Sequence, residues 1–299
     1  MVNSSTTSHV LHSVLRWLVP IGSCLLLGPL AGWLTHTLRA PDGGAHTSLL
    51  LSASPLLGLL AGAGAVLLAG IAGVFAAAII GTRMGLFTAG LVLAWASFGT
   101  GRIDGILGRV AAGGRGGGAG AMTLLSVEGL VVGLLGVLIA AAVLLVPVRR
   151  AASQADAQHH PVQHFAEPRK ILHRSAPLAL FAGVVGAGLV VWLVAQSTAK
   201  GQTFAAAALG GVVAGAALRI LAVHASGVWA FVAFAILSTA SPVLARFMSD
   251  DVAAAALSGQ LLRLAHPLPL DYLAGALVGV PMGLAWGASM VVKAETAAK

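Results

Sequence analysis

Long apolar runs alternate with short polar interruptions along the chain, and this pattern predicts eight membrane-spanning helices. A helix that crosses the hydrocarbon core needs about 20 mostly apolar residues, so charged residues mark where each predicted span ends. The predicted spans are residues 15–34, 55–81, 84–101, 129–148, 176–199, 201–218, 225–245 and 272–292. We therefore predict an all-α, polytopic membrane protein.

One long polar stretch divides the apolar pattern into two halves. The predicted organisation is a first transmembrane half at 1–148, a basic linker at 149–174 and a second transmembrane half at 175–299. Each half holds four predicted spans, and an acid precedes the last span of each, Glu128 in the first half and Asp271 in the second. This likeness suggests two parallel four-helix repeats related by an axis along the membrane normal. Chance similarity among helices rich in alanine and glycine is the alternative.

Composition agrees with a lipid environment. Hydrophobic residues make up 58% of the 299 residues and charged residues 9%, whereas roughly a quarter of the residues of soluble proteins are charged. The chain also holds 39 glycines, which suit transmembrane helices because small residues let helix backbones approach. The single cysteine, Cys24, excludes an internal disulfide and a metal site built from several cysteines.

The positions of lysine and arginine predict the orientation. With both termini in the cytoplasm, ten of the 17 basic residues fall on the inside and seven on the outside, and the densest group lies in the 149–174 linker. Cytoplasmic loops of membrane proteins carry such an excess of positive charge. We expect an integral protein of a bacterial inner (plasma) membrane, with both termini and the linker in the cytoplasm.

A stripe of glycines marks the last predicted span. Its members are Gly275, Gly279, Gly283 and Gly287. Residues four apart share one face of a helix, and glycines on that face let a second helix approach closely. The stripe predicts tight helix packing, either within the chain or between two copies, and supplies no chemistry.

Few ionisable residues lie in or beside the predicted spans. Each such group costs about 2.5–3.5 kcal/mol in hydrocarbon, so those present are candidates for an ion pathway or a polar pair. The candidates are Glu128, Asp271, Arg219 and His224. All four lie near predicted helix ends, where an interfacial position is the alternative. Glu128 and Asp271 could each act there by stabilising a helix N-terminus.

The segment His224-Ala225-Ser226-Gly227 resembles the nucleophile motif of rhomboid intramembrane proteases, and the glycine-striped last helix resembles the one that bears their catalytic histidine. The resemblance implies Ser226 as nucleophile and a base at position 272. This sequence has Tyr272 there, and a tyrosine with a pKa of about 10 is a poor base at neutral pH. That family requires a full span between the two pieces, and this sequence has none there. We assign no catalytic residue.

The 149–174 linker is rich in histidine and carries two acids, a composition that raises the possibility of a metal site. The residues are His159, His160, His164, His173, Asp156 and Glu167. Their spacing matches no structural zinc pattern. A solvated linker with its basic ends on anionic headgroups fits better. We therefore predict no metal and no cofactor.

The sequence favours a non-catalytic membrane protein that serves as a structural or accessory subunit of a larger membrane complex. Packing faces of small residues are plentiful, whereas deep polar groups are few. The expected partners are the lipid bilayer and other membrane subunits or a second copy. Nucleic acid is not an expected partner, because the chain has no folded basic domain. The alternative function is a small secondary transporter with a pathway between the two halves. A lipid-processing enzyme is a third possibility, but no set of nucleophile, base and acid can be assembled.

Overall fold

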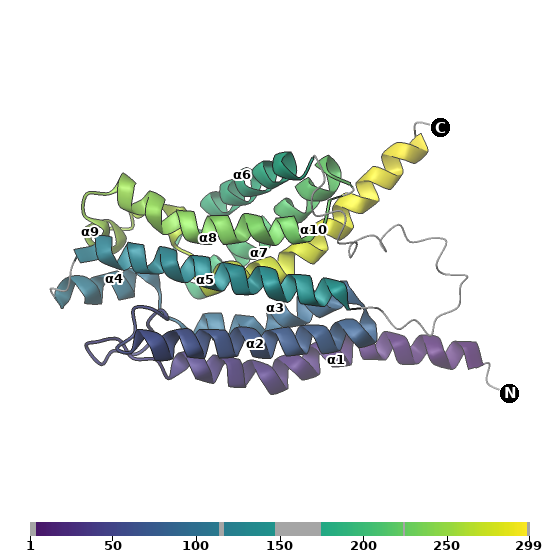
Figure 1. Cartoon of the computed structure of the whole chain (residues 1–299), viewed down its shortest axis with the longest axis horizontal. Helices are drawn as coiled ribbons and strands as arrows, with labels where there is room; N and C mark the ends of the chain where they lie inside the picture. The colour runs from purple at the N-terminus through teal and green to yellow at the C-terminus, as the bar shows by residue number, and fades with distance from the viewer. Residues whose placement is uncertain (1–3, 114–116, 147–174, 224, 298–299) are drawn as a thin grey trace.

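A computed structural model describes residues 4–113, 117–146, 175–223 and 225–297 (Figure 1). The described part of the chain is all-α and holds eight helices long and apolar enough to cross a membrane, which confirms the predicted fold class. These helices are α1 (Ser4–His36), α2 (Pro55–Ile80), α3 (Thr82–Gly99), α5 (Gly117–Leu145), α6 (Ala176–Val194), α7 (Lys200–Leu221), α8 (Val228–Met248) and α10 (Pro269–Ala297). The protein is thus a multispan membrane protein.

Three short elements lie between the long helices in the part of the chain that the structure describes. They are α4 (Ile103–Ala112), α9 (Val252–Leu257) and the 3-10 turn η4 (Arg263–Ala265). Figure 1 shows α4 and α9 together at the end of the bundle farther from the two termini. Their buried apolar side chains, among them Ile106, Leu107 and Val252, form a separate small core with residues of α5. This end of the bundle is therefore covered by folded chain.

The fourth long helix, α5, begins earlier than the sequence predicts. The predicted span starts at residue 129, yet α5 begins at Gly117 and includes glycines at 117, 118 and 120. Met122 and Leu125 in its first three turns are buried in the small core. Burial of these side chains stabilises helical structure that the local glycine content alone would disfavour.

A single glycine joins α2 to α3. Gly81 has a φ of +104°, and Thr82 immediately begins α3. Glycine adopts this backbone conformation without the steric cost that a Cβ imposes. The chain therefore reverses direction in one residue, and α2 and α3 pack directly against each other.

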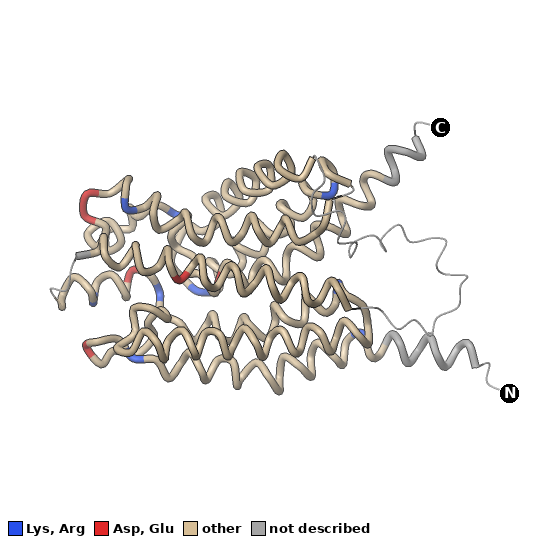
Figure 2. Tube along the Cα trace, in the orientation of Figure 1, with Lys and Arg blue, Asp and Glu red and all other residues tan. Residues whose placement is uncertain are grey.

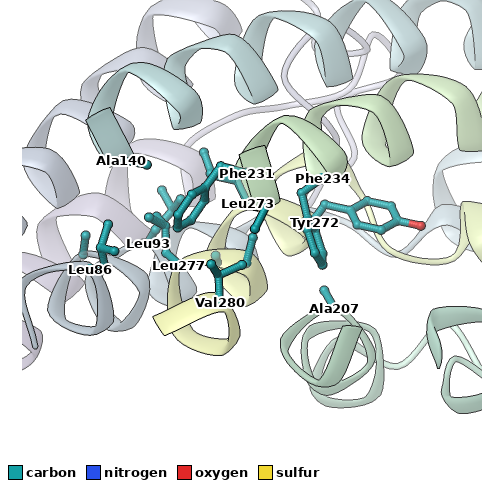
Figure 3. Close-up of a cluster of buried hydrophobic side chains, with 14 of the residues drawn as sticks. Leu86, Leu93, Ala140, Ala207, Phe231, Phe234, Tyr272, Leu273, Leu277 and Val280 are labelled. Atoms are coloured by element: carbon teal, nitrogen blue, oxygen red, sulfur yellow. The ribbon is translucent and has the colours of Figure 1, made fainter. Parts of the chain in front are cut away.

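The main core connects the two halves of the chain. Figure 3 shows Leu86 and Leu93 of α3, Phe231 of α8, and Leu273 and Leu277 of α10 in one buried cluster. Between the halves, α5 packs along α8, and α10 packs along α3. Many large apolar side chains on the outside are exposed, for example Leu26 of α1 at 73%. This arrangement fits a bundle surrounded by lipid.

The glycine stripe of α10 faces α7 of the same chain. A Cβ added at Gly279 would overlap the carbonyl oxygen of Ala208, and one added at Gly283 would overlap that of Val212. On the facing helix, a Cβ at Gly215 would lie 2.5 Å from the carbonyl oxygen of Val280. The two backbones are therefore in contact along the stripe, as small residues permit.

Replacing Gly279 with alanine is expected to destabilise the fold by about 1–3 kcal/mol, because the added methyl group must push α7 away. The measurement is thermal unfolding in mild detergent. Gly22→Ala on α1 is the matched control, because its Cβ would meet no heavy atom within 4 Å. In a helix, alanine is favoured over glycine by about 1 kcal/mol, so the control should melt at the same temperature or higher. Equal melting temperatures for the two variants would contradict the contact.

Candidate functional site

The most buried charged residue lies at the start of α10. Asp271 is in the first turn of that helix and is 0% exposed. Lys200, the first residue of α7, places Nζ 3.0 Å from each of the two carboxylate oxygens. The Lys200 side chain is 11% exposed, and its ammonium also donates to Thr100 Oγ1 at 2.8 Å. The two residues form a buried ion pair.

Three further donors point at the Asp271 carboxylate. Ser97 Oγ donates to Oδ1, and Thr203 Oγ1 donates to Oδ2 at 3.2 Å. The backbone N–H of Leu268 donates to Oδ2 at 2.9 Å. The last contact has the geometry of half a capping box, in which a side chain in the first turn reaches back to the residue before the helix. Each of these groups stabilises the ionised carboxylate.

A second carboxylate, that of Glu128, lies close to the pair. Glu128 is 1% exposed, and its Oε2 accepts hydrogen bonds from Ser48 Oγ at 2.6 Å and from the backbone N–H of Leu50 at 2.9 Å. Both donors belong to the connection between α1 and α2. Lys200 is near enough to attract Glu128 as well as Asp271. We call Glu128, Lys200 and Asp271 the charged cluster.

The alternative of an exposed, interfacial position does not fit Glu128, which is buried inside a helix. The sequence places this acid at the start of a helix, whereas α5 begins at Gly117 and Glu128 lies about three turns inside it. Asp271 does lie at a helix start, but it is buried and does not face headgroups. In the described structure, Figure 2 shows the acidic residues in the half of the bundle farther from the termini.

Sequence reasoning missed Lys200. The pattern treats it as the loop residue that ends one span, but it begins α7 and points into the bundle. The hydropathy pattern holds no signal that could have identified it, because residues just before it, such as Gln196, Ser197 and Ala199, are exposed as in an ordinary loop.

The two remaining candidate residues lie elsewhere. Arg219 is in the last turn of α7, about 28 Å along the helix from Lys200 at 1.5 Å per residue. It is 6% exposed, and its guanidinium donates to the carbonyl oxygen of Val223 at 2.5 Å. His224 lies outside the described residues. The structure therefore brings Glu128 and Asp271 together and keeps Arg219 apart from them.

The contacts of Tyr272 do not support the protease resemblance. Its hydroxyl donates to the carbonyl oxygen of Leu264 at 2.6 Å and lies 3.1 Å from Ser241 Oγ. Ser226 precedes the first residue of α8, and Ser241 lies more than three turns along that helix. The Tyr272 hydroxyl therefore forms its hydrogen bonds far from Ser226.

In the described residues, no group of three or more histidine, cysteine, aspartate or glutamate side chains could hold a metal ion. The histidine-rich linker lies outside those residues. The oxygen-rich charged cluster has two carboxylates and the hydroxyls of Ser48, Ser97 and Thr203. Oxygen groups of this kind are the ligands that hard cations prefer, and carboxylates can also take up a proton.

A buried histidine lies in the chain that leads into α10. His266 is 4% exposed, and its Nδ1 lies 2.9 Å from the carbonyl oxygen of Ala195. Burial, helped by the positive charge of Arg263, lowers the pKa of His266 below its ordinary value, although the carbonyl groups of Ala195 and Leu261 oppose the shift. The imidazole is therefore neutral in the fold at neutral pH.

This lowered pKa makes stability depend on pH. Below pH 6.5, the ordinary value, the unfolded chain takes up a proton at this site before the folded chain does, so unfolding becomes more favourable as the pH falls. We expect the melting temperature to drop over this range, and His266→Asn to make the drop smaller. The comparison is between melting curves of the two proteins at matched pH values. If the melting temperatures of both proteins fall equally with pH, His266 is not the group that causes the drop.

Comparison with protein-family models, with curated proteins and with solved structures found no match for this chain. What the structure establishes is a multispan membrane protein with a cluster of charged side chains buried between its helices.

Proposed function

We propose that this protein is a small secondary transporter and that the charged cluster is its ion-binding site. The observation that carries the proposal is the buried ion pair of Asp271 and Lys200. Ionisable groups inside membrane proteins are costly, and those that occur commonly mark ion pathways or proton relays. The sequence favoured an accessory subunit because deep polar groups looked scarce. The burial of Glu128 and Asp271 removes that reason.

The position of the cluster supports this function. Ser48, Ser97, Thr100 and Glu128 come from the first half of the chain, whereas Lys200, Thr203 and Asp271 come from the second. In transporters built from repeats, substrate and ion sites lie at the interface between the repeats. A cluster assembled from both halves has this placement.

The packing between the halves supports the two parallel four-helix repeats. If α3 corresponds to α8 and α5 to α10, a two-fold axis along the membrane normal requires two equivalent contacts. These are α5 with α8 and α10 with α3, and both occur. The short elements α4 and α9, which would also correspond, pack against each other as well.

We further propose that the protein lies in a bacterial inner membrane with both termini and the 149–174 linker in the cytoplasm. Figure 1 shows the start of α1 and the ends of α5 and α10 at one end of the bundle, which fits this topology. Fusions within the linker and at the C-terminus are expected to be active with a reporter that works in the cytoplasm and inactive with one that works in the periplasm. Periplasmic activity at either position would overturn the topology.

The transport function can be tested before a substrate is known. Purified protein in lipid vesicles is adsorbed on a solid-supported membrane, and jumps in proton, sodium or potassium concentration are applied. A transporter that takes an ion into the cluster is expected to give a protein-dependent current, strongly reduced in Asp271→Asn. Wild-type currents equal to those of protein-free vesicles under all three jumps, together with a stoichiometric partner after mild solubilisation, would instead support the accessory subunit.

A further inference from the structure

The charges of the cluster do not balance. When all three side chains are ionised, two carboxylates face one ammonium. In the described chain, the charged side chains that act on Lys200 are Asp271 and Glu128, and the one that acts on Glu128 is Lys200. Both acids are at most 1% exposed, so water does not compensate the excess charge. A net charge held in such surroundings is strongly unfavourable.

The uncompensated charge belongs to Glu128. Asp271 has the Lys200 ammonium 3.0 Å from each of its oxygens, as well as two hydroxyl donors and one backbone donor. Glu128 has two neutral donors on Oε2, Ser48 Oγ and the Leu50 N–H. The ammonium acts on it from farther away, without a direct ion pair of the kind that joins Lys200 to Asp271. Glu128 is therefore the carboxylate that lacks a counter-charge.

We propose that the cluster binds one additional unit of positive charge at Glu128, either a proton or a hard monovalent cation such as sodium. Oxygen ligands are the ones that hard cations prefer, and the carboxylate of Glu128 with the Ser48 hydroxyl supplies them. With this ion bound, the cluster is neutral. The evidence for binding is the charge imbalance of the cluster. That the protein also transports this ion rests on the proposed function.

Lys200 links the two acids. Its ammonium is attracted by both carboxylates, but it is bound by Asp271 and Thr100. Loss of the ion from Glu128 leaves a second negative charge that draws Lys200 away from Asp271. Binding at Glu128 and the Lys200–Asp271 pair therefore strengthen each other.

Infrared spectroscopy in heavy water at neutral pH can test the proposal, because a protonated carboxyl group absorbs apart from a carboxylate. The background is low, since the whole chain has nine acidic residues. In buffer with choline as the only cation, the wild type should show one protonated carboxyl group and Glu128→Gln none. Asp271→Asn should also show none, because Lys200 then balances Glu128. Lys200→Met should show two.

Adding sodium or potassium then distinguishes the two ions. Loss of the wild-type band identifies a metal cation that replaces the proton, and a band that persists identifies the proton alone. The proposal is overturned if the wild type shows no band in choline buffer, or if its band survives in Glu128→Gln. The two amide variants keep the shape of the side chains, so the test holds even if Lys200→Met fails to fold.

This readout needs no transport. The predicted band pattern in a protein that gives no current would reject the transport function and retain the ion site. Currents without the band pattern would retain the transport function and reject the ion site at Glu128.

Discussion

Replacing Lys200 with methionine is expected to lower the free energy of unfolding by about 3–5 kcal/mol, the usual cost of removing one partner of a buried ion pair. The cost arises because Asp271 is 0% exposed and loses the group that contacts both of its oxygens. Methionine keeps most of the length of the lysine stem, so the effect of lost packing is small. Thermal and denaturant unfolding in detergent would measure the change.

The chain offers a matched control for this variant. Arg102 and Asp104 form an ion pair at 2.7 Å, but their side chains are 56% and 27% exposed. Exposed pairs contribute about 0–1 kcal/mol, so Arg102→Met should have little effect. If the two variants cost the same, Lys200 does not pair with Asp271 in a buried site.

Adding Asp271→Asn to Lys200→Met should recover part of the lost stability. The single variant leaves a buried carboxyl group that must take up a proton or stay unpaired, and the double variant removes that group. An amide oxygen at the Oδ2 position still accepts from Thr203 Oγ1, and the amide NH2 at the Oδ1 position can donate to Ser97 Oγ. The interaction energy from the double-mutant cycle isolates the pair from the packing of either side chain. An absence of recovery would mean that Lys200 stabilises the fold by some route other than Asp271.

The number of spans was predictable because the bilayer imposes a simple rule on the sequence. Each crossing needs an apolar run of nearly fixed length, and each run here ends at a charged or strongly polar residue. The early start of α5 was not predictable in this way. Its first turns are stabilised by contacts with α4 and α9, such as the packing of Met122 and Leu125 in the small core, and a pattern along one segment does not show which segments meet.

The candidate site was also hard to predict, because it depends on contacts between segments that are distant in sequence. Glu128 and Asp271 were found as candidates because ionisable residues beside apolar runs are rare. Whether such a residue faces headgroups or the interior depends on the chain that covers it. Here the connection between α1 and α2 brings Ser48 and the Leu50 N–H onto Glu128 from about 80 residues away in sequence. Lys200 was read as a span boundary for the same reason, since an interfacial lysine and a buried one look alike in the hydropathy pattern.

The glycine stripe is an intermediate case. Its spacing specified which face of α10 is packed, because residues four apart share a helical face. It did not specify the partner. Gly211 and Gly215 on α7 provide the facing surface, but glycine pairs at the same spacing occur in other spans, including Gly58 and Gly62. Only the three-dimensional arrangement selects α7.

The double variant Glu128→Gln/Asp271→Asn is expected to reduce ion-driven currents in vesicles to the level of protein-free vesicles, with each single variant losing most of the current. The amides keep the size of the acids. Their oxygens, at the Oε2 and Oδ2 positions, can still accept from Ser48 Oγ and the Leu268 N–H, and the NH2 group at the Oδ1 position can donate to Ser97 Oγ. They cannot take up the ion, and the Lys200 ammonium loses its counter-charge. The unpaired ammonium should lower the melting temperature of the double variant, so its currents are measured on protein that keeps a monodisperse profile in detergent.

The control is Asp42→Asn/Asp250→Asn, which removes two exposed acids and makes the same change in net charge. It should leave the currents unchanged, so that a loss confined to the buried pair reflects the cluster and not the overall charge. If instead Asp271 serves only to stabilise the N-terminus of α10, and Glu128 only to hold the connection between α1 and α2, the amides cost stability but transport is retained. Full currents in the folded double variant would therefore reject the charged cluster as the ion site, because no carboxylate would remain there to hold the ion.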